Sequence, residues 1–330
     1  MHQTNVEIDP RDANTATRKK AVYVAISASV SVAVIQLIIG WVWNLESLIA
    51  EGIHTFLDGI DSVIVLITIF LAAKPADREH QFGHGKFEAL GAGIEGLFVL
   101  GAGIGIAIRA VNRLLEGAAP ETIRIESCAI LVVMSIFYYV VSIYLKRIAE
   151  ETGSPAVFAE AMHLRTHIYI NGGLAVGLLV GALGEWPLAD TLLALGVAVC
   201  LLGIAWQVLR EVWSQMMDLS LPRKELDAIA EMVEPFGARF IEVHGLRTRK
   251  AGVERHIEMH LVVAPDTTVA SAHELSHEIE KVIVDKWPAA HVTVHVEPLN
   301  QQHDESGTLF DGEPKVRTDD DSPLEREFLH

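Results

Sequence analysis

The chain has 330 residues, of which 50% are hydrophobic and 21% are charged, and its formal net charge at pH 7 is -17. This acidic balance argues against nucleic acid as a partner, and two cysteines are too few for a disulfide framework. Apolar residues concentrate between residues 21 and 213, and most of the charge lies outside that range. The asymmetry predicts a membrane domain with polar segments at its ends.

Six apolar segments are long enough to cross a bilayer, which takes about 20 residues. Charged, Gly and Pro residues separate them, as at Lys74 and Pro75. The first segment is longer than a signal-peptide core and lacks a clear cleavage site, so we expect it to be retained. The predicted spans cover residues 21–43, 48–72, 88–112, 126–146, 156–182 and 188–210.

The Lys and Arg residues of the loops predict the orientation, because these residues are enriched on the cytoplasmic side. With the N-terminus inside, twelve fall on inner segments and three on outer segments. We therefore expect both termini in the cytoplasm. The inner residues are Arg11, Arg18, Lys19, Lys20, Lys74, Arg78, Lys86, Lys146, Arg147, Arg210, Arg223 and Lys224, and the outer ones are Arg109, Arg113 and Arg124.

After Leu219 the long apolar runs give way to short alternating segments. The periodicity predicts helices at 222–236 and 271–286, and strands at 239–250, 254–263 and 291–297. The order αββαβ predicts a small α+β domain of ferredoxin-like type, with helices on one face of a sheet. The last 30 or so residues are acidic with few large apolar side chains, which is typical of disorder.

Two predicted spans carry ionisable side chains, which are costly inside a membrane and usually functional. His54 and Asp58 on the second span, and His163 and His167 on the fifth, are pairs four residues apart, so each pair lies on one helix face. Two such pairs facing each other would offer four N and O ligands in a tetrahedron, which suits zinc. The alternative is two polar stripes that only hydrogen-bond inside the bundle.

Two further clusters lie outside the spans. Asp77, His80 and His84 fall in one predicted inner loop, where they could bind a metal or simply face water. The C-terminal domain has seven histidines in about 50 residues, together with Glu297, and some of them could be solvated surface residues. These histidines are His244, His256, His260, His273, His277, His291 and His295.

Two short motifs point to enzymes, but their context does not fit. His273, Glu274 and His277 match the zinc-protease pattern HExxH on a predicted helix, although a small domain of this kind offers no evident substrate cleft. Residues 91–96 match the dinucleotide pattern GxGxxG, but they lie inside a predicted span with no strand before them. Gly101 and Gly105 on the same span predict close helix packing in the bilayer.

Taken together, these motifs resemble the cation diffusion facilitator family, proton-coupled exporters of zinc and related divalent ions. The resemblance covers roughly residues 15–298. It rests on the paired ligands of spans two and five, on the loop from Pro75 to Lys86 with Asp77, His80 and His84, and on His244 followed by the segment 246–249, Leu-Arg-Thr-Arg.

The resemblance implies a homodimer in the lipid bilayer with three metal sites in each protomer. They are a transport site of His54, Asp58, His163 and His167, a loop site of Asp77, His80 and His84, and a cytosolic site near the dimer interface drawn from His244, His260, His273, His295 and Glu297. It also implies a Lys–Asp interlock between protomers, for which Lys86 and Asp218 stand at the matching places.

The sequence departs from the family pattern at His167, where the family usually has Asp. One carboxylate with three imidazoles still suits zinc and disfavours Mn²⁺ and Mg²⁺, while Cd²⁺, Co²⁺, Ni²⁺ and Fe²⁺ stay open. Arg165, between the two histidines, should point away from the site, towards Glu95 or Glu51.

We therefore expect a metal/proton antiporter, not an enzyme, that exports metal by alternating access from a bacterial cytoplasm across the inner membrane. The alternatives are a membrane-anchored zinc metalloprotease and a metal sensor. The expected domains are a cytosolic N-terminal segment (1–20), an all-α six-helix transmembrane bundle (21–213), a cytosolic metal-binding domain (219–298) and an acidic disordered tail (299–330).

Overall fold

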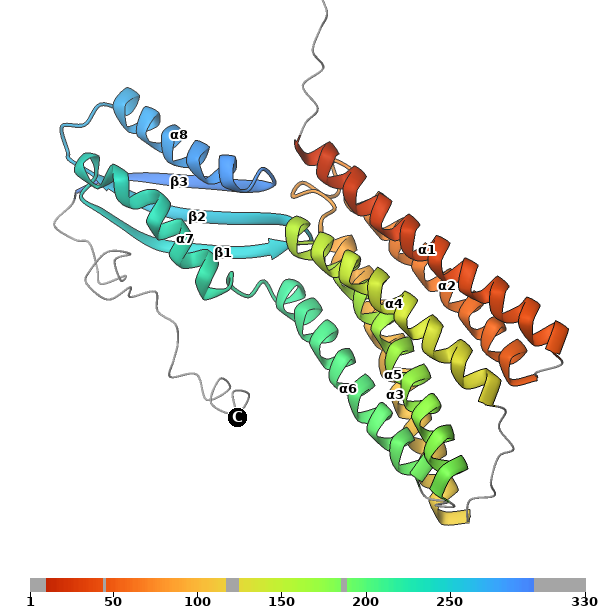
Figure 1. The fold of residues 1–330 in the computed structure, drawn as a ribbon. Helices are drawn as coiled ribbons and strands as arrows, with labels where there is room; N and C mark the ends of the chain where they lie inside the picture. Colours follow the sequence, from red (N-terminus) through yellow and green to blue (C-terminus); the bar gives the residue numbers. More distant parts are fainter. Residues whose placement is uncertain (1–9, 44–45, 117–124, 185–188, 300–330) are drawn as a thin grey trace, which may run out of the picture. The chain divides into compact units, whose positions relative to one another are not determined.

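The computed structural model describes residues 10–43, 46–116, 125–184 and 189–299 (Figure 1). These residues divide between two compact units, with the boundary between Met216 and Met217. Of the predicted acidic tail only Leu299 is described, and residues 1–9 of the predicted N-terminal segment also lie outside the described residues.

Six long helices make up the first unit, and five of them are long and apolar enough to cross a membrane when only the described residues are considered. The helix α5 is not among the five, so the sixth span stays a prediction. Helix α1 already begins at Pro10, in the polar segment before the apolar run. The helices are α1 (Pro10–Trp43), α2 (Glu46–Ala72), α3 (Lys86–Glu116), α4 (Ile125–Thr152), α5 (Pro155–Gly184) and α6 (Ala189–Met216).

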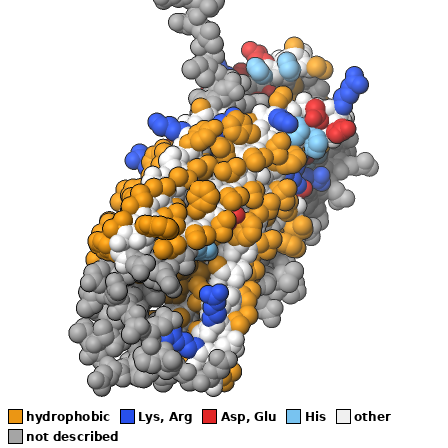
Figure 2. Space-filling view, turned by 90° about the vertical axis from the view of Figure 1, so that its right-hand side faces the viewer, with side chains coloured by type: hydrophobic (Ala, Val, Ile, Leu, Met, Phe, Trp, Pro, Cys, Tyr) orange, Lys and Arg blue, Asp and Glu red, His pale blue; other side chains and the backbone are white. Residues whose placement is uncertain are grey.

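Helix α2 shows the inverted polarity that a membrane requires. Its apolar side chains Ile53 and Leu57 are 51% and 53% exposed, whereas the carboxylate-bearing Asp58 is only 8% exposed. In a soluble protein the apolar face would turn inward, so the exposed apolar face fits contact with lipid. Figure 2 shows one such face, where hydrophobic side chains cover the helices and charged ones are sparse.

The six helices pack mainly in the pairs α1 with α2, α4 with α5, and α3 with α6. Glycines allow some of these approaches: a Cβ added at Gly91 would lie 2.2 Å from Thr68 Oγ1 of α2, and one at Gly96 would lie 3.0 Å from Val208 of α6. A Cβ at Gly101 or Gly105 would meet nothing within 4 Å in this chain, whereas one at their neighbour Gly103 would lie 3.2 Å from Leu201 of α6.

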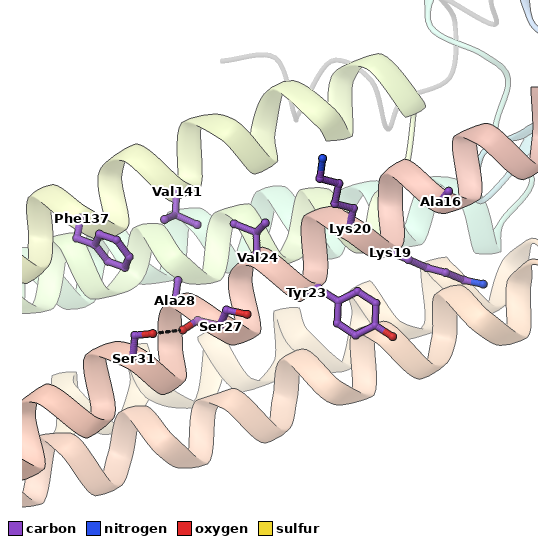
Figure 3. Close-up of a pocket in the computed structure, with 10 residues that line it drawn as sticks. All are labelled: Ala16, Lys19, Lys20, Tyr23, Val24, Ser27, Ala28, Ser31, Phe137 and Val141. Atoms are coloured by element: carbon purple, nitrogen blue, oxygen red, sulfur yellow. Dashed lines mark hydrogen bonds between the residues drawn. The ribbon is translucent and has the colours of Figure 1, made fainter.

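A groove of about 640 Å³ lies between α1 and α4 (Figure 3). Its floor is apolar, with Val24, Ala28 and Val141, and lysines lie toward one end. One of these, Lys19, places its Nζ 3.8 Å from the centre of the Phe70 ring on α2. The groove therefore faces the surroundings of the bundle and does not reach its polar interior.

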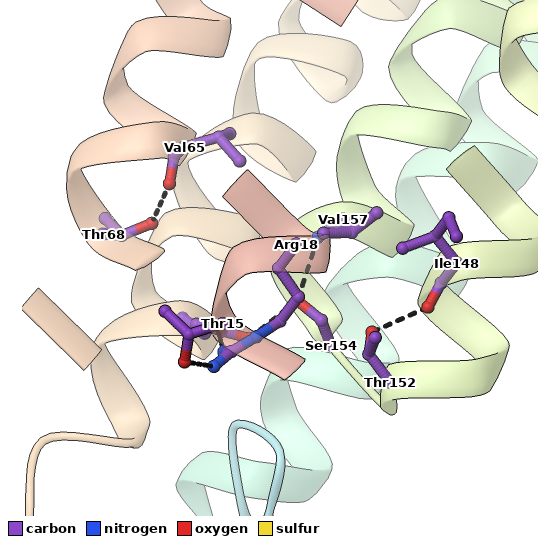
Figure 4. A network of polar contacts seen from close by, with 9 residues as sticks. Thr15, Arg18, Val65, Thr68, Ile148, Thr152, Ser154 and Val157 are labelled. Carbon is purple, nitrogen blue, oxygen red and sulfur yellow. Dashed lines mark hydrogen bonds and ion pairs between the residues drawn. The ribbon is translucent and has the colours of Figure 1, made fainter. Parts of the chain in front are cut away.

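A buried polar contact joins three helices near the start of α3. Arg18 of α1 makes an ion pair with Glu88 of α3, and both side chains are almost completely buried. Ser154, just before α5, donates to the other Glu88 oxygen at 2.7 Å. Thr15 accepts from Arg18 at 2.7 Å, as Figure 4 shows. Breaking a buried pair by removing one partner costs about 3–5 kcal/mol, so this contact fixes α1, α3 and α5 to one another.

The second unit is a three-stranded sheet with helices, in the predicted order αββαβ. Strand β2 is central, pairing antiparallel with β1 and parallel with β3. A short 3₁₀ helix, η1, replaces the end of the first predicted helix and the start of the first predicted strand. The elements are α7 (Arg223–Val233), η1 (Glu234–Arg239), β1 (Glu242–Ala251), β2 (Glu254–Val263), α8 (Val269–Lys286) and β3 (Ala290–Pro298).

The two faces of this sheet differ in chemistry. Ile257, Met259 and Leu261 alternate along β2 toward one face, where they form a core with Ile229 of α7 and Ile279 of α8. The residues between them, which include His256 and His260, therefore lie on the opposite face. The histidines of β2 thus lie on the face of the sheet that the helices leave uncovered.

Candidate metal sites

The first candidate site lies inside the membrane unit, where α2 meets α5. Asp58, His163 and His167 are all buried, and each offers a ligand atom within 4.8 Å of the others. The Nε2 atom of His167 lies 3.4 Å from Asp58 Oδ2. In the described part of the chain, Asp58 Oδ2 and His163 Nε2 are buried without a hydrogen-bond partner, which is uncommon in folded proteins unless an ion or water binds there.

His54 lies at the edge of this cluster. Its Nε2 is 3.7 Å from Asp58 Oδ2, and its ring centre is 6.5 Å from that of His167. Its side chain is 57% exposed, in contrast to the other three. The structure therefore brings three of the four predicted ligands into one group and leaves His54 at its edge.

Two side chains that were not among the predicted ligands lie against the cluster. Glu95 of α3 lies with Oε1 2.7 Å from His163 Nδ1, and it is 2% exposed. The ring of Tyr138, on α4, stacks on His167 with 4.8 Å between centres. A carboxylate in the middle of a predicted span was a usable signal for Glu95, whereas Tyr138 carried none.

The second candidate site is the loop between α2 and α3. His80 Nδ1 and His84 Nε2 each lie 3.4 Å from a carboxylate oxygen of Asp77, and the two imidazole centres are 4.4 Å apart. The backbone N–H groups of His80 and Glu79 donate to Asp77 Oδ1 at 2.7 and 2.9 Å. The His80 contact is the main reason why the pKa of the Asp77 carboxyl is lowered. The loop thus holds an ionised carboxylate between two imidazoles.

The third candidate site lies on the uncovered face of the sheet, and Glu297 is its centre. Glu297 Oε1 is 2.8 Å from His260 Nδ1 and 3.4 Å from His295 Nε2, and Glu297 Oε2 is 3.9 Å from His244 Nε2. Strand register explains this, because His260 is paired with His244 on one side and with His295 on the other. Gly245, at φ 62°, takes part in the irregularity of β1 that follows His244.

His273 does not join this group in the same protomer. It lies on α8, and its ring stacks on that of His277 with 6.3 Å between centres. Helix α8 packs on the apolar face of the sheet, opposite to Glu297. A role for His273 near a dimer interface therefore stays a prediction. The interlock of Lys86 with Asp218 also stays a prediction, because the two residues belong to different units.

Comparison with known proteins assigns both units. Residues 22–217 match the model of the cation efflux transmembrane domain, and residues 221–299 match that of the cation efflux protein cytoplasmic domain. The chain belongs to the cation efflux, or cation diffusion facilitator, family. The predicted family is thereby confirmed, and the protein is an integral-membrane cation efflux transporter for divalent metals, not an enzyme. The HExxH residues of α8 are consequently no protease site.

Several individual proteins are similar to this chain. An uncharacterised transporter of Synechocystis, sll1263, is 32% identical over 252 residues, which cover 76% of this chain and 81% of the relative. The cation-efflux pump FieF of Serratia proteamaculans is 29% identical over 285 residues, covering 85% of this chain and 93% of the pump. A solved structure of the zinc transporter CzrB in its zinc form is 38% identical, covers 25% of this chain and 94% of that chain, and has a TM-score of 0.24.

Proposed function

We propose that this cation efflux protein exports Zn²⁺ from the cytoplasm in exchange for protons, and that Asp58, His163 and His167 bind the ion during transport, with His54 completing the set. The observation that carries the proposal is the buried cluster of these residues between α2 and α5. Three imidazoles and one carboxylate match the ligand types and the number that zinc takes in tetrahedral sites.

Exchange for protons follows from the chemistry of the ligands. Imidazole nitrogens bind a metal only when deprotonated, so Zn²⁺ and H⁺ compete for the same atoms. A site open to the cytoplasm would lose protons as it binds zinc, and the same site open to the other side would release zinc as it binds protons.

The other two clusters have supporting roles in this proposal. The exposed Asp77, with His80 and His84, would collect the ion at the membrane surface. The site around Glu297 would sense the cytoplasmic metal level by stabilising a homodimer. We place the protein in a bacterial inner membrane, as six spans with both termini in the cytoplasm, and assign the cytosolic domain to the ferredoxin-like type.

A metal panel in sealed vesicles tests the proposed cargo. Purified protein is reconstituted with a pH gradient, and the transport of Zn²⁺, Cd²⁺, Co²⁺, Ni²⁺, Fe²⁺ and Mn²⁺ is followed at equal free concentrations. We expect Zn²⁺ to be carried at a lower half-saturating concentration than Mn²⁺. Faster and tighter Mn²⁺ transport would contradict the assignment of three imidazole ligands.

A further inference from the structure

The predicted ligands of the transport cluster do not carry enough negative charge to neutralise a divalent ion. Asp58 is the only carboxylate among the four predicted ligands, because His167 stands where the family usually has Asp. A bound divalent ion would therefore leave about one positive charge in a membrane interior, where an uncompensated charge is costly. The surroundings of the cluster must compensate for it.

Glu95 is placed to do this. It is 2% exposed, and it approaches the cluster from α3, a helix that contributes none of the predicted ligands. Its Oε1 atom lies 2.7 Å from His163 Nδ1, which is ion-pair distance, although the two groups are not aligned for a hydrogen bond in this structure. This leaves the other ring nitrogen, Nε2, available for the metal. Carboxylate, histidine and metal in that order form a common arrangement in which the carboxylate orients the ring and raises its basicity.

Other acidic side chains of the bundle are placed differently. Glu160 of α5 is fully buried; its Oε1 accepts a hydrogen bond from Ser62 of α2 at 2.7 Å, and its Oε2 is buried without a hydrogen-bond partner among the described residues. Asp61 and Glu51 of α2 are partly exposed. Among the described residues, Glu95 is the one carboxylate besides Asp58 that the structure places within 4 Å of a histidine of the buried cluster.

We propose that Glu95 is a positioning residue for transport, which holds His163 in its metal-binding orientation and supplies the negative charge that His167 lacks. The inference rests on the proposed function, because it presupposes that His163 binds the cargo. It predicts that a carboxylate is needed at one of two places, at position 95 behind the ligand or at position 167 among the ligands. If Glu95 had a purely structural role, a carboxylate at position 167 would not compensate for its loss.

The test measures the half-saturating Zn²⁺ concentration for transport in vesicles at one fixed pH. The central comparison is between the wild type, Glu95→Gln, His167→Asp and the double variant. Glu95→Gln is expected to raise this concentration about 10–100-fold, the usual effect of losing such a partner. In the double variant, the added His167→Asp should bring the half-saturating Zn²⁺ concentration most of the way back to the wild-type value. Glu95→Asp, which keeps the charge one methylene further away, should fall between the wild type and Glu95→Gln.

Matched controls separate the specific effect from a general one. Glu160→Gln removes another buried carboxylate of the same bundle, and adding His167→Asp to it should give no recovery. Unchanged half-saturation in Glu95→Gln, a double variant no better than Glu95→Gln, or equal recovery of Glu160→Gln would each overturn the proposal. If the wild type carries no Zn²⁺ at all, the proposed function fails instead, which is a distinguishable result.

Discussion

Asp58 of α2 and His167 of α5 lie 3.4 Å apart, with the carboxylate Oδ2 facing the imidazole Nε2. These residues are 109 positions apart in the sequence, and the contact brings together the two helices whose predicted ligand pairs were recognised from spacing. One carboxylate oxygen with imidazole nitrogens around it is a nitrogen-rich site, which favours zinc over harder ions.

The first prediction concerns the choice of metal. His167→Asp replaces an imidazole by a carboxylate, so the site becomes harder and should carry Mn²⁺ better relative to Zn²⁺. A free carboxyl titrates near pH 4 and a free imidazole near pH 6.5, so protons displace the metal from the variant only at lower pH. Zn²⁺ transport should therefore persist to lower pH than in the wild type.

The measurement is transport of Zn²⁺ and Mn²⁺ in vesicles between about pH 5.5 and 7.5, a range that brackets the imidazole titration. His277→Asp is a matched control, because that exposed side chain of α8 belongs to none of the three clusters. Identical metal preference and identical pH profiles in wild type and His167→Asp would mean that His167 is not a ligand.

The second prediction concerns the stability of the membrane unit. Glu88→Gln removes the carboxylate that faces Arg18, and both side chains are buried. Losing one partner of a buried pair should lower the free energy of unfolding by about 3–5 kcal/mol. Glu151→Gln breaks an exposed pair with Arg147 and should cost at most about 1 kcal/mol. Unfolding in detergent, followed by circular dichroism, compares the two, and equal stability would contradict the buried role of Glu88.

The spacing of residues predicted the positions of the helices and strands well, because spans and alternating strands follow simple periodicities. It also singled out the paired residues on α2 and α5, since ionisable groups are rare inside spans, and the structure groups three of them. It did not predict Glu95 as a neighbour of His163, because that contact depends on how α3 packs against α5 and not on the spacing within either helix. For the same reason the spacing did not tell which glycines of α3 pack closely within the chain, as Gly91, Gly96 and Gly103 do.

The third prediction concerns the cytosolic site. Glu297→Gln keeps the size of the side chain but removes the charge shared by His260, His295 and His244. Zinc that binds only the folded state stabilises it by about 2.7 kcal/mol at 100 times its dissociation constant. The substitution should therefore remove most of the zinc-induced protection of the strands.

Amide hydrogen exchange of the full-length protein gives the local measurement, because peptides from β1, β2 and β3 report on this site apart from the membrane clusters. In the wild type, zinc should slow exchange in all three strands. The control His277→Ala should respond to zinc like the wild type. Equal zinc protection in Glu297→Gln and wild type would show that the histidines around Glu297 are only solvated.

The most direct test of zinc/proton exchange is the uptake of Zn²⁺ into vesicles driven by a pH gradient alone, in the wild type and in Asp58→Asn. The account predicts that the wild type accumulates Zn²⁺, that an ionophore which collapses the gradient stops the accumulation, and that Asp58→Asn, folded and inserted to the same extent, accumulates none. Two results would contradict zinc/proton exchange at this site. One is Zn²⁺ uptake by Asp58→Asn at the wild-type rate, and the other is wild-type uptake that is the same with and without the pH gradient.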